Sequence, residues 1–71
     1  MKVVVKVKFN TSKEYFENFG GNKYLLYLPF EQDDDSANVI IHMLSRKIGA
    51  SPGKIEYAGQ DMNKDWVFEV L

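Results

Sequence analysis

The chain opens on a segment in which apolar and polar residues alternate, residues 3–9. One side of this segment carries Val3, Val5, Val7 and Phe9. The other side carries Lys2, Val4, Lys6 and Lys8. A period of two residues is that of a β-strand with one buried face, so we expect the lysine side to face water.

A second strand is predicted at residues 23–30, after two polar segments. The first, residues 10–14, is typical of a turn, in which Thr11 could cap one helical turn and Glu14 could reach back to it. The second, Gly20-Gly21-Asn22, predicts a chain reversal because these residue types adopt positive φ at little cost. The strand itself, Tyr24-Leu25-Leu26-Tyr27-Leu28 at its centre, is apolar on both faces, so its second face should also be covered.

The segment from Asp34 to Gly49 carries the start, the apolar face and the stop of one helix. Asp34, Asp35 or Ser36 can cap it, and carboxylates at this end complement the helix dipole. The predicted buried stripe recurs at three- and four-residue spacing and consists of Ala37, Ile40, Ile41, Leu44 and Ile48. Gly49, with Pro52 shortly after it, predicts the end of the helix.

Two more strands are predicted after the helix. Pro52-Gly53 suits a type II turn, and residues 54–58 then alternate with Ile55 and Tyr57 inward. Residues 59–64 form a polar reversal, and residues 65–71 alternate again, with Trp66 and Phe68 on one side. The predicted order of strand, strand, helix, strand, strand indicates an α+β fold, a two-layer sandwich in which one helix packs on one face of a mixed sheet.

Length and composition predict one small domain, residues 1–71. At this size about 60% of the unfolded chain's surface is buried on folding. A hydrophobic content of 45% argues against disorder, and the lack of cysteine excludes disulfides and thiolate zinc sites. No stretch approaches the roughly 20 apolar residues of a membrane span, and the alternating start differs from a signal peptide. We therefore expect a soluble cytoplasmic protein.

The charge pattern bears on nucleic-acid binding. Nine basic and ten acidic residues give a formal net charge of −1, so the whole-molecule field neither recruits nor strongly excludes nucleic acid. Lys2, Lys6 and Lys8 on the first strand form a local face that could bind phosphates. The same lysines would also discourage edge-to-edge aggregation, and no aromatic residue alternates with them for base stacking.

The chain resembles the YggU-like family, small proteins known mainly as a domain of unknown function. That family opens its helix with two prolines, a variable residue and Asp-Gly-Lys-Ala-Asn, and carries a Gly and later a Lys after its third strand. The matching positions here are Asp34, Ala37, Asn38, Gly59 and Lys64. The departures include Glu31-Gln32 in place of the prolines, Asp35 in place of the Gly and Ser36 in place of the basic residue. The resemblance implies the same fold and leaves the function open.

The resemblance also implies that the helix start and the last hairpin loop converge on one edge of the sheet. Asp34, Asn38 and Lys64 would then form a candidate ligand or enzymatic site, because Asn donates and accepts hydrogen bonds and Lys offers a positive charge to an anion. Asn38 could instead bind backbone groups of the preceding loop.

The residues predict no metal, cofactor or catalytic group. The acidic run at residues 31–35 lacks the alternating ligands and the turn glycine of a calcium loop, and is more typical of a solvated helix start. His42 has no cysteine or second histidine with which to hold zinc. No serine has a catalytic partner beyond that one histidine, which lowers the expectation of an enzyme.

The surplus of apolar strand residues carries the leading functional hypothesis. Val4, Val67, Leu71 and the second face of residues 24–28 cannot all lie under one helix of about three turns. Either residues 16–19 fold over them, or a protein partner or second copy of the chain does. We therefore expect a noncatalytic protein interaction module that uses the uncovered sheet face. The alternatives are the ligand site at the helix start and RNA binding on the lysine face.

Overall fold

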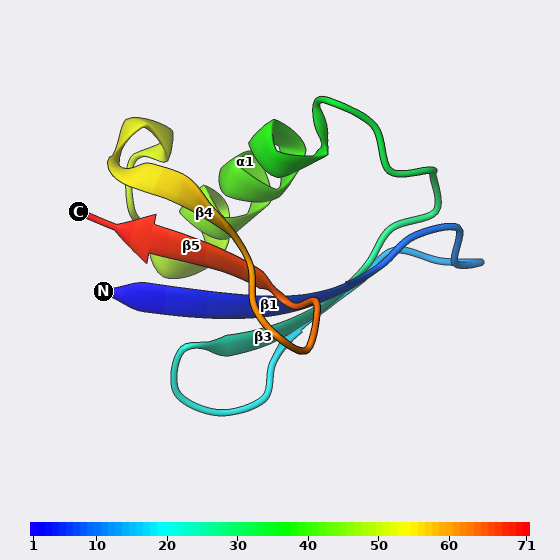
Figure 1. Cartoon of the computed structure of the whole chain (residues 1–71), viewed down its shortest axis with the longest axis horizontal. Coiled ribbons are helices and arrows are strands. Elements are labelled where there is room, and N and C mark those ends of the chain that lie inside the picture. The colour runs from blue at the N-terminus through cyan, green and yellow to red at the C-terminus, as the bar shows by residue number, and fades with distance from the viewer.

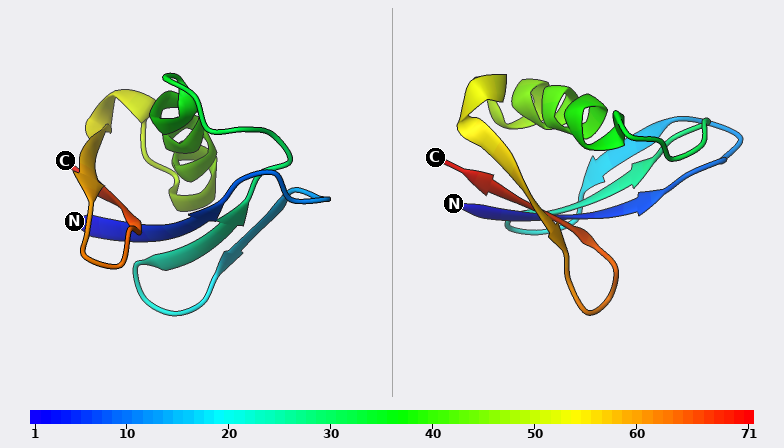
Figure 2. Two further views of the ribbon diagram at one scale, coloured as in Figure 1. Left: turned by 45° about the vertical axis from the view of Figure 1, so that its right-hand side comes forward. Right: turned by 45° about the horizontal axis from the view of Figure 1, so that its top comes forward.

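The computed structural model describes residues 1–71 and comprises one mixed sheet and one α-helix (Figure 1). The elements are β1 (Lys2–Lys8), β2 (Tyr15–Asn18), β3 (Lys23–Tyr27), α1 (Ser36–Ile48), the short 3₁₀ helix η1 (Pro52–Lys54), β4 (Ile55–Gln60) and β5 (Trp66–Val70). The strand order is β2-β3-β1-β5-β4, with β1 parallel to β3 and the other pairs antiparallel. The helix lies on one face of the sheet (Figure 2), which confirms the predicted α+β two-layer architecture.

The sequence prediction lacks one strand, β2, at the edge of the sheet. Residues 15–18 pair antiparallel with β3 across the predicted Gly20-Gly21 reversal. The helical turn expected just before them does not form; instead the Thr11 hydroxyl donates to the Lys13 carbonyl oxygen at 2.8 Å. A four-residue strand is too short for its alternation to stand out, so the turn residues on either side dominated the prediction.

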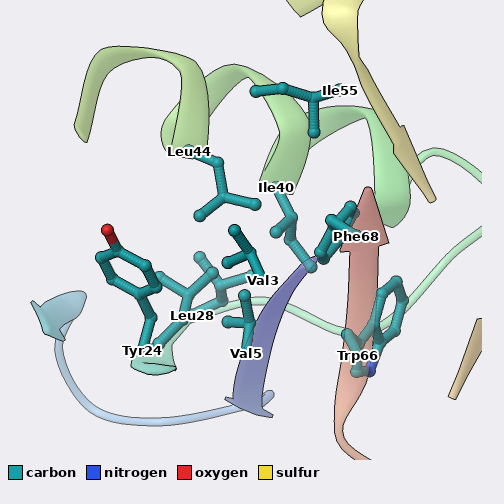
Figure 3. Close-up of a cluster of buried hydrophobic side chains, with 10 residues drawn as sticks. Val3, Val5, Tyr24, Leu28, Ile40, Leu44, Ile55, Trp66 and Phe68 are labelled. Atoms are coloured by element: carbon teal, nitrogen blue, oxygen red, sulfur yellow. The ribbon is translucent and has the colours of Figure 1, made fainter. Parts of the chain in front are cut away.

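The core forms where the inner face of the sheet meets α1 (Figure 3). Its buried residues are Val3, Val5, Tyr24, Leu26, Leu28, Ile40, Leu44, Ile55, Trp66 and Phe68. Ile40 and Leu44 are fully buried, and the other three residues of the predicted helix stripe pack against the cluster. The predicted helix stripe and the inward positions of β1 and β5 are therefore confirmed. Tyr57 of β4 contacts Trp66 and Phe68 on the same side of the sheet but is 40% exposed, so its predicted burial is wrong.

The start of α1 is held by Asp33 and Ser36. The buried Ser36 hydroxyl accepts a hydrogen bond from the Asp33 backbone N–H at 2.8 Å and donates to Asp33 Oδ1 at 3.3 Å. Asp33 Oδ1 also accepts from the Asp35 backbone N–H at 2.9 Å. None of the three predicted residues caps the helix with its side chain. Asp35, the N-cap residue, makes no side-chain cap hydrogen bond, and the bonds of the Ser36 hydroxyl go to Asp33, which precedes the helix.

The end of α1 follows the prediction. Gly49 adopts the left-handed conformation, with φ of 76°, and its backbone N–H donates to the Ser45 carbonyl oxygen at 2.9 Å. The next turn differs, since residues 52–54 form η1 and not a type II turn. A type II turn needs positive φ at its third residue, and Gly53 does not have it. At 13 residues, α1 is not long and apolar enough to cross a membrane, and the fold has no other α-helix.

Of the two alternatives for the second face of the sheet, coverage by residues 16–19 does not occur. Phe16 lies opposite Leu26 in the β2–β3 register and packs against the core on the helix side. The segment extends the sheet sideways because its backbone pairs with β3. No helix covers the face opposite α1, which we call the open face, although the loop of the β4–β5 hairpin lies on that side (Figure 2) and shares a hollow with Val4 and Lys6.

Candidate functional site

The open face is the side of the sheet turned away from α1. The alternation along each strand and the register between strands place the following residues on it: Lys2, Val4, Lys6, Lys8, Tyr15, Glu17, Lys23, Leu25, Tyr27, Glu56, Val67 and Glu69. The predicted lysine side of the first strand thus occupies the middle of the sheet. Its neighbours on this face come from β3 on one side and β5 on the other.

Aromatic side chains stand beside the lysines at the β2 edge. Tyr15 and Tyr27 are opposite each other in register, with ring centroids 5.9 Å apart. They border a hollow of about 470 Å³ that is also lined by Lys8 and Lys13. Tyr15 is 45% exposed, so an aromatic surface and two positive charges are accessible at one place.

A second hollow of about 300 Å³ lies at the opposite end of β1 and β3. Lys6, Lys23 and Phe19 line it, together with Asp61 and Asp65 from the β4–β5 hairpin. Phe19 follows β2 directly and is 55% exposed. Each hollow on this side of the molecule therefore combines lysines with an exposed aromatic ring.

The lysines of the open face have no carboxylate partner. The chain has one ion pair, in which the N-terminal amino group of Met1 contacts Glu69 Oε1 at 3.3 Å. Glu17, Glu56 and Glu69 flank the lysines on β2, β4 and β5. Carboxylates also line both hollows, Glu14 in the first and Asp61 and Asp65 in the second. The lysines therefore run along β1 and β3 with acidic groups beside them as well as at the margins of the face.

The phenol of Tyr15 has a raised pKa. Its hydroxyl donates to Glu17 Oε2 on the same side of β2. That hydrogen bond, followed by desolvation and the nearby charges of Glu17 and Tyr27, raises the pKa of Tyr15 above its ordinary value of 10.0. Glu17 is thus engaged by a phenol and oriented along the edge of the face.

The structure does not bring Asp34, Asn38 and Lys64 into one site. Asp34 and Asn38 are exposed at the start of α1, and Asn38 Nδ2 contacts Asp35 Oδ1 at 3.5 Å. Lys64 belongs to the β4–β5 hairpin loop, which extends beyond the sheet on the side away from α1 (Figure 2). None of the three lines a hollow, so the convergence implied by the family resemblance is absent.

The acidic run and His42 also have local structural roles. Asp33 organises the helix start, and the His42 Nδ1–H donates to the Asn38 carbonyl oxygen at 2.9 Å. No three His, Asp or Glu side chains gather in a way that could hold a metal ion. The acidic run and His42 therefore form no binding site in this structure.

Sequence reasoning missed the aromatic residues of the candidate site. No aromatic residue alternates with the lysines of the first strand, which argues against RNA binding. Tyr27 nevertheless reaches the same face from the adjacent β3, and Tyr15 and Phe19 reach it from β2 and the residue after it, one strand further out. The signal was available in Tyr15-Phe16-Glu17-Asn18-Phe19, whose alternation places Tyr15 and Phe19 on one side. It required recognising β2 as a strand of the sheet.

Comparisons of the chain with protein-family models, with curated proteins and with solved structures found no match. The resemblance to the YggU-like family therefore stays a prediction from the residues quoted above.

Proposed function

We propose that the chain is a noncatalytic binding module whose open face binds single-stranded RNA. The observation that carries this proposal is the placement of lysines from β1 and β3 beside accessible aromatic rings from β2 and β3. Aromatic rings stack on bases of any sequence, and lysines neutralise the phosphates between them. The sheet of the RNA-recognition motif binds single-stranded RNA by stacking bases on its aromatic residues in this manner.

A protein partner on the same face is supported less well than the sequence suggested. The apolar residues of the open face are few and recessed: Val67 is only 8% exposed, and Val4 and Leu25 are half-buried. Lysine is depleted at the centre of protein interfaces, whereas here it is the commonest residue type of the face. The chemistry therefore favours a polyanion over an apolar surface.

The ligand or enzymatic alternative gains no support, because its residues do not converge. We also propose the cytoplasm as the location of the protein, in keeping with the lack of cysteine.

The test is a fluorescence-anisotropy titration of a labelled oligouridine RNA of about ten nucleotides at several salt concentrations. If four lysines of the open face contact phosphates, the logarithm of the association constant should fall with the logarithm of the salt concentration with a slope of about −3. Each phosphate contact with a single strand contributes about −0.7 to this slope. Lys6→Gln should reduce the slope by about 0.7. The matched control is Lys47→Gln, which removes the same charge on the helix side, where Lys47 lies over the Phe16 ring.

Binding that is insensitive to salt, or that weakens equally in the two variants, would overturn the RNA proposal, as would no binding at all. The chain's own association state provides the competing outcome. If the protein forms a dimer that Leu25→Lys abolishes, the open face is an interface between copies of the chain.

A further inference from the structure

A second candidate binding surface lies on the other side of the sheet, between β2 and α1. We infer that an extended acidic peptide of another protein pairs with the free edge of β2 and places its side chains in the hollow between β2 and α1. This inference does not depend on the RNA proposal, because the two surfaces share no face of the sheet.

The first observation is the direction of the β2 backbone groups. The Phe19 N–H donates to the Lys23 carbonyl oxygen at 3.1 Å, so Phe19 faces β3. Residues two apart in an antiparallel strand share this direction, and Glu17 and Tyr15 therefore also bond to β3. The N–H and C=O groups of Phe16 and Asn18 consequently point outward from the sheet, where an added strand could pair with them.

The second observation is the hollow beside this edge, the most voluminous of the three on the molecule at about 510 Å³. Phe16, Val39 and Met43 give it an apolar surface, and all three side chains are half-buried. The hollow exists because α1 packs closest to β4 and η1, at the opposite edge of the sheet. A strand added to β2 would direct alternate side chains toward this apolar surface.

The third observation is charge. Arg46 and Lys47, in the last turn of α1, line the hollow, and Glu14 is the only carboxylate there. Lys47 Nζ lies 5.4 Å from the centroid of the Phe16 ring, and neither cation makes an ion pair. Acidic side chains on a peptide strand would meet these cations beside the apolar surface, which is why the occupant we infer is acidic.

A peptide fits this edge better than a second copy of the chain. β2 has only four residues, so a β2–β2 contact would be far smaller than the roughly 1,200 Å² of a stable interface. It would also bring two copies of Glu14 and Glu17 onto adjoining strands. A weakly bound peptide needs neither a large area nor self-complementary charges.

The experiment uses a fluorescein-labelled peptide of about six residues in which glutamate and valine take turns at every second position, with serine between them, so that both residue types face the hollow. The control ligand, the lysine-valine peptide, has lysine in place of each glutamate. The acidic peptide should bind, and amide exchange at Phe16 and Asn18 should slow while Glu17, already paired with β3, changes little. Arg46→Gln with Lys47→Gln should weaken binding by about fivefold. Lys54→Gln removes a positive charge from η1, which adjoins β4 at the opposite edge of the sheet, and should leave binding unchanged.

Unchanged amide exchange at Phe16 and Asn18 would overturn the inference, and so would equal binding of the lysine-valine peptide. Concentration-dependent protection of the same amides without peptide would identify a second copy of the chain as the occupant. Failure here is distinguishable from failure of the RNA proposal, because the Arg46 and Lys47 variants leave the open-face lysines intact.

Discussion

Tyr15 and Tyr27 stand opposite each other on β2 and β3, with their ring centroids 5.9 Å apart and their planes inclined at 51°. Offset aromatic pairs of this geometry are attractive, so the two rings hold each other at the margin of the open face. The Tyr15 hydroxyl is at the same time engaged by Glu17. Tyr15, Tyr27 and Glu17 therefore place an aromatic surface and a carboxylate next to the hollow that the two tyrosines line.

The first prediction concerns the ionisation of Tyr15. Its pKa is raised, first through the hydrogen bond to Glu17, so Tyr15 should titrate above 10.0 in a pH series of tyrosine ring NMR signals. Glu17→Gln should return the pKa of Tyr15 toward its ordinary value, and Glu56→Gln on β4 should not. The protonated phenol is favoured in the folded state, so its stabilising effect is present below pH 10.0 and is lost as pH rises through the folded pKa. A Tyr15 pKa that Glu17→Gln leaves unchanged would exclude the hydrogen bond as its cause.

The second prediction separates stacking from charge on the open face. Tyr27→Ala should weaken binding of oligouridine by about tenfold, because stacking of one base contributes about 1–3 kcal/mol. The salt slope should stay the same, since no positive charge is lost. The control is Phe30→Ala. It also removes an aromatic side chain, which is 40% exposed, but from a loop and not from the open face. Equal losses in both variants would mean that Tyr27 does not contact the RNA.

The architecture was predictable because periodicity and turn chemistry agree along most of the chain. Val3, Val5 and Phe68 occupy the inner face that their alternation predicts, and Ile40 and Leu44 meet them from the predicted helix stripe. Gly49 ends the helix because positive φ is needed there. At each of these positions, the conformation that the residue type favours locally agrees with the place of that residue in the folded structure.

The candidate site was less predictable because it depends on register between strands. Alternation assigns Tyr15 and Tyr27 to faces only after β2 is recognised and paired with β3, and a four-residue strand gives little periodic signal. The grouping of Asp34 with Lys64 rested on family resemblance alone. The β4–β5 hairpin places Lys64 on the side of the sheet opposite the helix (Figure 2).

The third prediction uses two glycines that differ in backbone conformation. Gly49→Ala should destabilise the fold by about 1 kcal/mol, because its φ of 76° is unfavourable for a residue with a Cβ. No atom lies within 4 Å of the added Cβ, so the cost is purely conformational. Gly53→Ala has ordinary φ and a nearest neighbour at 3.9 Å, and it should be neutral or stabilising by about 0.5 kcal/mol. Urea denaturation of both variants gives the comparison, and equal effects would contradict the role of φ.

The fourth prediction concerns the buried hydroxyl at the start of α1. Ser36 is 1% exposed, and its hydroxyl is the hydrogen-bond partner of the Asp33 backbone N–H at 2.8 Å. Ser36→Ala should therefore lower the free energy of unfolding by about 1–2 kcal/mol, because it leaves that N–H without its partner and removes a bond to Asp33 Oδ1. For a chain of this length the total stability is about 4–10 kcal/mol, so the loss is readily measured by urea denaturation.

The matched control is Ser51→Ala, which removes the same hydroxyl from an exposed residue with no side-chain cap hydrogen bond. Asp33→Asn provides a second check, since the amide keeps an acceptor oxygen for Ser36 and Asp35 and should cost less than Ser36→Ala. Such an ordering would show that the helix start depends on the hydrogen bonds of residues 33–36 more than on the charge of the acidic run. A larger loss for Asp33→Asn would instead assign the dominant effect to the attraction between the carboxylate and the helix dipole.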